Sequence, residues 1–484
     1  MSELSFQSAG ELAQMIAEKK ISSLELTDYF IRQIENYDEQ INSVVARDFD
    51  SALGAAAAFD KLLSREGPVG PLHGVPITVK EALDVAGLAT TWGLPFLNDN
   101  VVATDAEVVR RLKCAGAIIL GKTNVPTGLG DAQTANEIYG VTNNPWDTTR
   151  TPGGSSGGSA AAIASGFSAL EIGSDMGGSI RVPAAFCGVY GHKPTWGIVP
   201  DHGHGLPGMV APVDLGVIGP IARHIDDLSL AMDLLVGPQR LNQPAWQLNL
   251  PVSAADTLKD YRVAVWSDDR IAPVCAEISQ KALEVGDLLI EQGAKVSFEA
   301  RPPIDFEQNF ALHQHLMWSL TSVGLTDAEY QQALKVAAAL PPDDSSCLAN
   351  AARAQVLSHK DWLLFNNQRE LLRYEWQKFF QDWDIILCPV YSVPAFAHDH
   401  RPMKERGHIV DGAPQDYFQP MFWSGIATAS YLPATTFPAG SSLSGLPIGL
   451  QVIGGEYRDN TTLEFVRLLS QQLANVPSLP ALGD

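Results

Sequence analysis

The sequence has few cysteines and a deficit of positive charge. Its five cysteines are widely spaced, odd in number and form no Cys-x-x-Cys pair: Cys114, Cys187, Cys275, Cys347 and Cys388. This pattern argues against a disulfide framework or a zinc site. Lysine and arginine total 33 against 55 aspartates and glutamates, which gives a formal net charge of −22. Nucleic acid and anionic lipid are poor partners for a surface of this charge.

The sequence also lacks a long apolar run. The stretch with the fewest charges, residues 159–190, consists largely of Gly, Ala and Ser and is interrupted by Glu171, Asp175 and Arg181, so we expect no membrane span. No basic segment followed by an apolar one opens the sequence, so we expect no secretory leader and a cytoplasmic protein. With 484 residues, of which 45% are hydrophobic and 18% charged, the chain can bury a large core.

Short apolar runs that alternate with helical segments indicate a layered α/β fold. Residues 75–79, 117–120 and 261–266 are rich in the branched apolar side chains that are typical of strands. Residues 106–114 and 274–292 have the periodicity of helices. Alternation of this kind predicts a sheet with helices packed against it.

Two segments of the chain, residues 1–60 and 238–400, differ from this alternating pattern. Ser8 and Ser22 each precede a glutamate by three positions, and these capping boxes predict two helices. We interpret residues 1–60 as a helical arm that docks on the main domain. Residues 238–400 are interpreted as a more peripheral layer within the same domain, which begins with a surface connection.

One local motif matches the phosphate-binding loop of nucleotide-binding proteins. Residues 116–123 read Gly-Ala-Ile-Ile-Leu-Gly-Lys-Thr and satisfy the pattern G-x-x-x-x-G-K-[ST]. Such a loop needs free backbone N–H groups that point at the phosphates. The apolar run predicts instead a strand whose N–H groups are paired in a sheet, so P-loop nucleotide binding is a distant alternative.

A second local motif matches the nucleophile elbow of serine hydrolases. Residues 154–158, Gly-Ser-Ser-Gly-Gly, fit the pattern G-x-S-x-G with Ser156 at its centre. An elbow follows a buried strand, whereas residues 145–153 are rich in turn-forming residues. Ser156 therefore lacks the strand that would present it as a nucleophile.

A third motif, residues 173–183, reads Gly-Ser-Asp-Met-Gly-Gly-Ser-Ile-Arg-Val-Pro. Consecutive glycines let the backbone approach a ligand, and they can turn successive N–H groups toward the oxygen of a substrate carbonyl. Ser179 follows these glycines directly and would be placed to attack that carbonyl. The alternative interpretation is a structural turn between two elements.

A nucleophilic serine needs a base, and the histidines suggest none. His202 with His204, and His398 with His400, lie in loop-like segments that we expect to be solvated. Lysine can act as a base when burial and neighbouring positive charge keep it neutral. Lys80 follows a predicted buried strand, and ligand sites in α/β sheets lie at such strand ends. The alternative is a strand-end lysine that reaches solvent.

Taken together, five segments make the sequence resemble the amidase signature family. They are residues 74–80, 152–162, 173–183, 187–195 and 445–451. The likeness extends from about residue 10 to 470 and is far more specific than any single motif. It implies one domain over the whole chain, 1–484, folded as an α/β/α sandwich with a mixed central sheet covered by helices.

The resemblance also implies roles for residues at matching positions. Ser179 corresponds to the nucleophile, Ser155 to a serine on a cis peptide bond, and Lys80 to the base. In this scheme Ser155 relays a proton between Ser179 and a neutral Lys80, and the reverse relay protonates the leaving amine. The implied oxyanion hole is formed by the backbone amides of Met176, Gly177, Gly178 and Ser179. We assign Ser156, Asp175 and Arg181 to the support of this site.

The sequence departs from the family pattern at two positions. Many members have an acidic residue where this chain has Thr127, and the glutamine-using subunits have an aspartate where it has Met421. A charged substrate would lose a partner there, while an aryl group would gain apolar surface. The pocket is therefore predicted to be apolar and to include Thr127, Met421, Phe422 and Trp423. The alternative is that the aromatic residues belong to the ordinary core.

We therefore predict a metal-free, cofactor-free serine hydrolase that cleaves the C–N bonds of small neutral amides through an acyl-enzyme. Anilides and aryl or alkyl amides are the first choice, with carbamates (urethanes) and esters as related substrates. The alternative enzyme is the glutamine-using component of a larger amidotransferase complex, which needs partner chains. We expect a small-molecule substrate and no nucleic-acid or membrane partner. A homodimer is the assembly that we consider for this chain.

Overall fold

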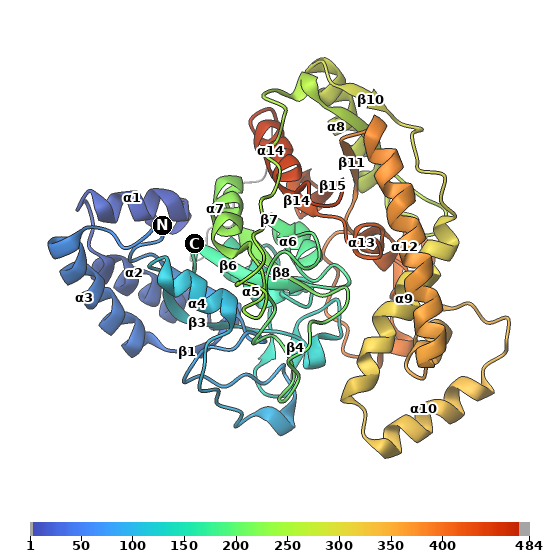
Figure 1. Cartoon of the computed structure of the whole chain (residues 1–484), viewed down its shortest axis with the longest axis horizontal. Helices are drawn as coiled ribbons and strands as arrows, with labels where there is room; N and C mark the ends of the chain where they lie inside the picture. The colour runs from blue at the N-terminus through green and yellow to red at the C-terminus, as the bar shows by residue number, and fades with distance from the viewer. Residues whose placement is uncertain (1–2, 474–484) are drawn as a thin grey trace.

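A computed structural model describes residues 3–473. Across these residues, the largest sheet has eleven strands and runs through the centre of the molecule (Figure 1). In spatial order the strands are β1 (Val44–Arg47), β3 (Ile118–Thr123), β2 (Pro76–Lys80), β6 (Leu170–Asp175), β8 (Val217–Ala222), β7 (Tyr190–Lys193), β14 (Ala434–Ser441), β15 (Pro447–Gly454), β11 (Ile385–Pro389), β9 (Arg262–Val265) and β10 (Lys295–Ser297).

The sheet is mixed, as predicted. Strand β2 pairs in parallel with β3 and β6, and β9 pairs in parallel with β10 and β11. Between these two groups, β8, β7, β14 and β15 pair antiparallel. Every residue of β2, β3 and β6 is buried, which explains why continuous apolar runs mark them in the sequence. The strands predicted at 75–79, 117–120 and 261–266 are confirmed as β2, β3 and β9.

Helices cover both faces of the sheet, which confirms the predicted α/β sandwich. Helices α5 and α6 pack against one face, and α7 and α14 against the other. The helices are α1 (Ala9–Ala17), α2 (Ser23–Tyr37), α3 (Phe49–Glu66), α4 (Glu107–Cys114), α5 (Gly157–Ala164), α6 (Arg181–Cys187), α7 (Ile225–Leu235), α8 (Ala276–Glu291), α9 (Phe306–Ser319), α10 (Asp327–Ala339), α11 (Cys347–Ala354), α12 (His359–Asp382), α13 (Met421–Thr428) and α14 (Asp459–Ser470). Two small hairpins, β4 (Ala135–Asn136) with β5 (Gly140–Val141) and β12 (Gly407–Val410) with β13 (Ala413–Asp416), complete the fold.

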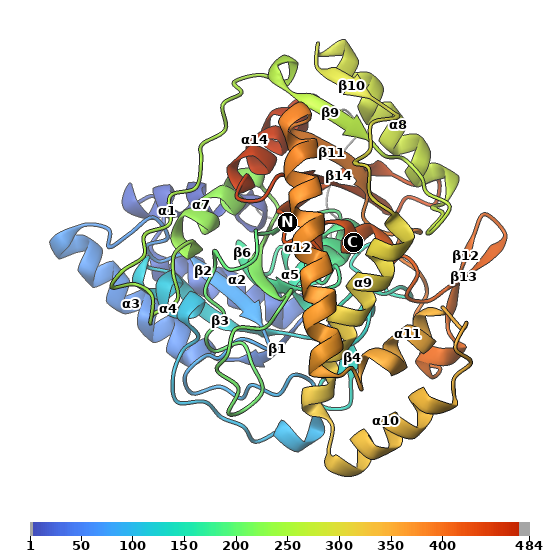
Figure 2. The same ribbon diagram turned by 45° about the vertical axis from the view of Figure 1, so that its right-hand side comes forward.

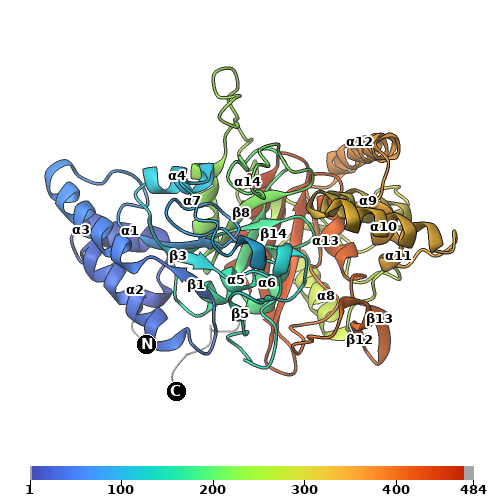
Figure 3. The ribbon, with the colours of Figure 1, turned by 90° about the horizontal axis from the view of Figure 1, so that it is seen from below.

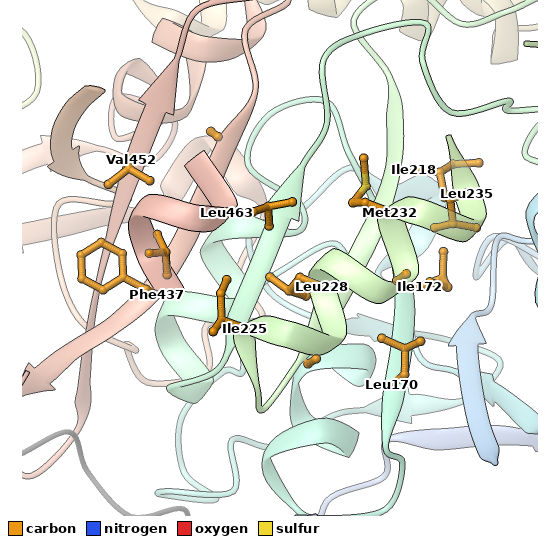
Figure 4. Close-up of a cluster of buried hydrophobic side chains, with 14 of the residues drawn as sticks. Leu170, Ile172, Ile218, Ile225, Leu228, Met232, Leu235, Phe437, Val452 and Leu463 are labelled. Atoms are coloured by element: carbon orange, nitrogen blue, oxygen red, sulfur yellow. The ribbon is translucent and has the colours of Figure 1, made fainter. Parts of the chain in front are cut away.

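Helix α7 shows how the sheet is covered. Its apolar residues recur at helical spacing and form one stripe. That stripe lies over the apolar side chains of β6 and β8 (Figure 4). Because side chains alternate along a strand, Leu170 and Ile172 face α7, while Glu171 and Gly173 of the same strand face α5. Both faces of β6 are therefore covered, by α7 on one side and by α5 on the other.

The N-terminal segment combines helices with one strand. Both predicted capping boxes are present, at the starts of α1 and α2. Asp227 of α7 accepts hydrogen bonds from the amides of Ala9 and Gly10 at 2.9 and 3.1 Å, and these bonds dock α1 on the sheet layer. The segment 1–60, predicted as a helical arm, also contains a strand, because β1 adds an edge strand to the sheet antiparallel to β3.

The segment 238–400 is peripheral only in part. Helices α9 to α12 lie at the end of the molecule opposite to α1–α3 (Figure 3), and α12 crosses the front of the view in Figure 2. Strands β9, β10 and β11, however, belong to the central sheet. The branched apolar residues of β9 and β11 are buried between layers, so this part of the segment is core.

No helix within residues 3–473 is both long enough and apolar enough to span a bilayer.

Candidate active site

The predicted catalytic side chains come from segments that meet at the end of β2. Lys80 is the last residue of β2 and is completely buried. Its Nζ lies 2.7 Å from Oγ of Ser155 and 3.0 Å from Oγ of Ser174, the latter on the neighbouring strand β6. The lysine therefore contacts two hydroxyl groups and does not reach solvent, so the alternative interpretation of Lys80 is wrong.

Ser155 lies in the glycine-rich loop that leads into α5. The peptide bond between Gly154 and Ser155 is cis. A Cβ on Gly154 would come within 2.3 Å of the carbonyl oxygen of Asp131, so only glycine fits there. The amide of Ser156 donates to the carbonyl oxygen of Ser179 at 3.0 Å. This bond holds the Ser155 loop beside the predicted nucleophile.

Ser179 is partly exposed and lies in the turn between β6 and α6. Within residues 3–473 its hydroxyl makes no hydrogen bond with another residue. Ser179 therefore has an accessible, uncommitted hydroxyl, and its backbone is bonded to the loop that carries Ser155. An accessible hydroxyl is one requirement of a nucleophile.

The predicted oxyanion hole needs one correction. The amide of Gly178 donates to Oδ1 of Asp175 at 3.0 Å, so it is not free to bind a substrate oxygen. In the described part of the chain, the amides of Met176, Gly177 and Ser179 have no such partner. Gly178 instead supplies the backbone conformation of the turn, with a φ of +107° that disfavours other residues.

Asp175 and Arg181 form a buried ion pair that organises this turn. Both side chains are fully buried and are joined by contacts of 2.9 and 3.0 Å. Asp175 also accepts from the amides of Gly178 and Ile180. Although burial acts to raise the pKa of Asp175, the Arg181 charge and its hydrogen bonds hold that pKa well below its usual value. The carboxylate therefore stays ionised and fixes the turn around Ser179.

The electrostatic setting favours a neutral Lys80. Burial lowers the pKa of Lys80 to about 7, against the opposing influence of the Asp175 and Glu171 carboxylates. Burial therefore favours the free amine of Lys80 over its ammonium form. A free amine can accept a proton through Ser155.

Three polar residues near this centre were not predicted from the sequence. Ser174 binds Lys80 directly, and Glu171 is buried two residues before the start of the glycine-rich turn. His204 was expected in a solvated loop, but its ring packs against Trp92 with the ring centroids 5.1 Å apart. Burial and the nearby charge of Lys80 lower the pKa of His204 to about 3. Isolated polar residues on strands and loops carry no sequence signal for such contacts.

Methionine side chains cover the exposed side of the turn. A Cβ on Gly177 would lie 2.5 Å from Cε of Met421 and 3.2 Å from Sδ of Met317, so both side chains rest on this glycine. Met176 and Trp318 belong to the same apolar cluster. The surface next to Ser179 is therefore apolar and is built from α9 and α13.

Two of the other predicted pocket residues are core residues, while the place of Thr127 at the pocket stays a prediction. Phe422 and Trp423 are buried in the core, where both pack against Trp266. Thr127 is exposed, on a short 3-10 turn. Phe422 and Trp423 are therefore core residues, because successive residues of α13 point in different directions and only Met421 points toward Gly177. This corrects the pocket predicted from the sequence.

The segment that matches the P-loop pattern is a strand. Residues 118–123 form β3, which is paired on both sides with β1 and β2. Lys122 is buried, and its Nζ donates to the carbonyl oxygen of Ala89 and to Thr90 at 2.5 and 2.9 Å. The backbone of this segment is therefore paired in the sheet, and Lys122 already has hydrogen-bond partners within the protein. The segment forms no phosphate-binding loop.

A protein-family model described as Amidase matches residues 25–463 of the chain. Among curated proteins, the chain is 31% identical to a glutamyl-tRNA(Gln) amidotransferase subunit of Moorella thermoacetica, over 99% of both chains. It is 32% identical to the indoleacetamide hydrolase of Bradyrhizobium diazoefficiens, over 94% of this chain and 84% of that protein.

Solved structures give the same relationship. A bacterial aryl acylamidase of the amidase signature family superimposes with a TM-score of 0.82 at 25% identity, over 97% of both chains. A chain from a vestigial protein complex that reveals the evolutionary origins of an s-triazine catabolic enzyme superimposes with a TM-score of 0.81 at 27% identity, over 97% of this chain and 100% of the other.

Proposed function

This chain belongs to the amidase signature family and is an amidase, and from that premise we propose that it hydrolyses small neutral amides through an acyl-enzyme on Ser179. The observation that carries the proposal is the buried Lys80–Ser155 hydrogen bond of 2.7 Å beside the uncommitted hydroxyl of Ser179. This contact supports Lys80 as the base and Ser155 as the relay to Ser179 in a mechanism without histidine.

In the first half of the reaction, Ser179 attacks the carbonyl carbon of the amide. Its proton passes to Ser155 as the proton of Ser155 passes to the amine of Lys80. The developing negative charge on the carbonyl oxygen is stabilised by the free amides of Met176, Gly177 and Ser179. The C–N bond then breaks as the proton returns through Ser155 to the leaving nitrogen.

In the second half, water attacks the ester formed on Ser179. The same relay removes a proton from the water and returns it to Ser179 as the acyl group leaves as a carboxylic acid. Because the oxyanion amides bind the same carbonyl oxygen whichever heteroatom flanks it, carbamates and esters are expected as further substrates.

The choice of neutral substrates rests on the apolar surface beside Ser179. Met176, Met317, Trp318 and Met421 supply this surface. An aryl or alkyl group gains about 25 cal/mol for each Å² removed from water there. A zwitterion would lose several kcal/mol of solvation without an ionic partner, on the order of 2–7 kcal/mol for each polar group left unpaired.

The second candidate is a glutamine amidotransferase subunit, which the similarity to the Moorella thermoacetica protein favours. Such a subunit needs a pocket that accepts the charged groups of glutamine. Met421 packs on Gly177 at the position where the family pattern of glutamine-using members has an acid. This contact supports the small-molecule amidase over the alternative.

The two functions are separated by kcat/KM for a neutral aryl anilide and for glutamine, measured on the purified chain. We expect the anilide to be favoured by at least about tenfold, or 1.4 kcal/mol. Met421→Asp should reduce anilide turnover by roughly 10- to 100-fold because it buries an unpaired carboxylate, whereas Met421→Leu should stay within a few-fold. Glutamine turnover equal to or above that of the anilide would favour the amidotransferase.

A further inference from the structure

Glu171 is a fully buried carboxyl group that the proposed reaction does not use. It lies on β6, on the face that α5 covers. Hydroxyl groups from three elements surround it: Thr78 of β2 and Thr123 of β3 donate to its two oxygens, the latter at 3.0 Å, and Ser159 of α5 lies 2.9 Å from Thr123. The carboxyl group is therefore held in a built polar cradle inside the sheet layer.

This cradle lies close to the proposed base along strand β2. Thr78 pairs with Glu171 across β2 and β6, and Lys80 is two residues further along β2. Residues two apart on a strand point to the same face, so the carboxyl group of Glu171 and the amine of Lys80 share one buried layer. The charge of each acts on the other.

Such a buried pair has two arrangements without net charge. In one, an ammonium faces a carboxylate; in the other, a free amine faces a carboxylic acid. Both hold one proton, and a buried pair that carries no net charge avoids the cost of an uncompensated ion. Only the second arrangement contains a base for Ser155.

We propose that Lys80 and Glu171 share a single proton across the neutral pH range, so that Glu171 is a positioning residue that determines how much of Lys80 is the free amine. The expected effect of Glu171 on turnover rests on the proposed function. The shared proton does not, because it is a property of the two buried side chains alone.

The electrostatics of both groups agree with this. Burial raises the pKa of Glu171 to about 8, against the hydrogen bonds from Thr78 and Thr123. Burial lowers the pKa of Lys80 to about 7. The two groups therefore titrate in the same range, and their protonation is coupled.

The other titratable groups around the pair either have partners of their own or are neutral. Asp175, on the same strand, is ion-paired with Arg181 of α6 and feels the charge of Lys193 on β7. His204 is neutral because its pKa is lowered, and Lys122 of β3 donates to Ala89 and Thr90. Helix α5 has no charged residue. Glu171 is thus the group whose charge changes together with that of Lys80.

The test is the pH dependence of kcat/KM for a neutral anilide in the wild type and in Glu171→Gln. Gln keeps the shape but cannot ionise, so Lys80 loses the charge that stabilises its protonated form. Around neutral pH, where the wild type holds part of Lys80 as the ammonium beside a carboxylate, kcat/KM relative to the plateau should be raised at least about twofold in the variant, so that the midpoint of the acid limb moves to lower pH. At the foot of the limb, where Glu171 of the wild type is itself protonated, the two profiles should coincide. A midpoint that stays in place or moves to higher pH would overturn the proposal.

Two further measurements keep the test specific. Asp227→Asn also removes a buried carboxylate, but one that caps α1 away from the site; it should lower stability and leave the limb in place. If Glu171→Gln does not fold, infrared spectra of the wild type and of Lys80→Met decide. The C=O band of the protonated acid should be stronger in Lys80→Met, and an unchanged band would contradict proton sharing even in a protein without activity.

Discussion

At the scale of single residues, the site depends on a lysine that burial keeps partly neutral. Lys80 has no exposed surface, and its amine contacts Ser155 and Ser174. A group whose charged form is disfavoured by burial becomes a base at a pH where an exposed lysine is still protonated. The rate should therefore follow the deprotonation of this residue.

We expect Lys80→Ala to lower kcat for a neutral anilide by roughly 10²- to 10⁴-fold, the usual contribution of a general base. In the wild type, kcat/KM should rise with pH through about 7, because only the free amine accepts the proton. Lys80→Arg serves as the control, since its guanidinium stays protonated and should be equally inactive. Wild-type turnover in either variant would exclude Lys80 as the base.

Single residues also show where sequence reasoning ends. Ser179 stands out because two glycines precede it, and Lys80 because it follows an apolar strand, whereas the role of Ser155 came from the resemblance to the amidase signature family. Ser174 and Glu171 do not stand out, because their contacts depend on strand register. The oxyanion role predicted for the Gly178 amide is wrong for a similar reason, since the partner that occupies it is a side chain three residues earlier.

At the scale of elements, the turn between β6 and α6 is held by a buried ion pair. Arg181 donates to Asp175 from inside α6, and also to the carbonyl oxygen of Ser424 on α13 and to Gln451 on β15. One guanidinium thus connects the turn, the helix that carries Met421 and the central sheet. The pair fixes the geometry of the turn rather than taking part in chemistry.

We expect Arg181→Met to lower the free energy of unfolding by about 3–5 kcal/mol, because it leaves the Asp175 carboxylate buried without a partner. Asp175→Asn combined with Arg181→Met removes both charges and should recover part of that loss. Urea denaturation of the wild type, both single variants and the double variant gives the coupling energy. Additive effects in this cycle would show that the two side chains do not act as a pair.

Elements were predictable where local signals are strong. Capping boxes identified the starts of α1 and α2, and apolar runs identified β2, β3 and β9. Strand β1 was missed because four residues between two helices carry too weak a pattern. For α13, the aromatic residues signalled burial, but only the packing of the helix decided that Met421 points toward Gly177 while Phe422 and Trp423 point into the core.

At the scale of the whole molecule, the mixed eleven-stranded sheet brings together segments that are far apart in the sequence, such as Arg181 and Ser424, which are 243 residues apart. Lys80 and Ser174 come from its parallel part, whereas Met421 lies on a helix that joins the sheet through β14. The α/β class followed from the alternation of strands and helices. The order of the strands did not, because pairing between distant segments leaves no mark in local composition.

The measurement that tests the central claim most directly is the site of covalent modification by a fluorophosphonate. The purified full-length chain is treated with the reagent, digested and mapped by mass spectrometry, with Ser179→Ala as the matched control. We predict a single adduct on Ser179 that is absent from the control and accompanies loss of anilide hydrolysis. An adduct on Ser155 or Ser156 with Ser179 unmodified would contradict the account.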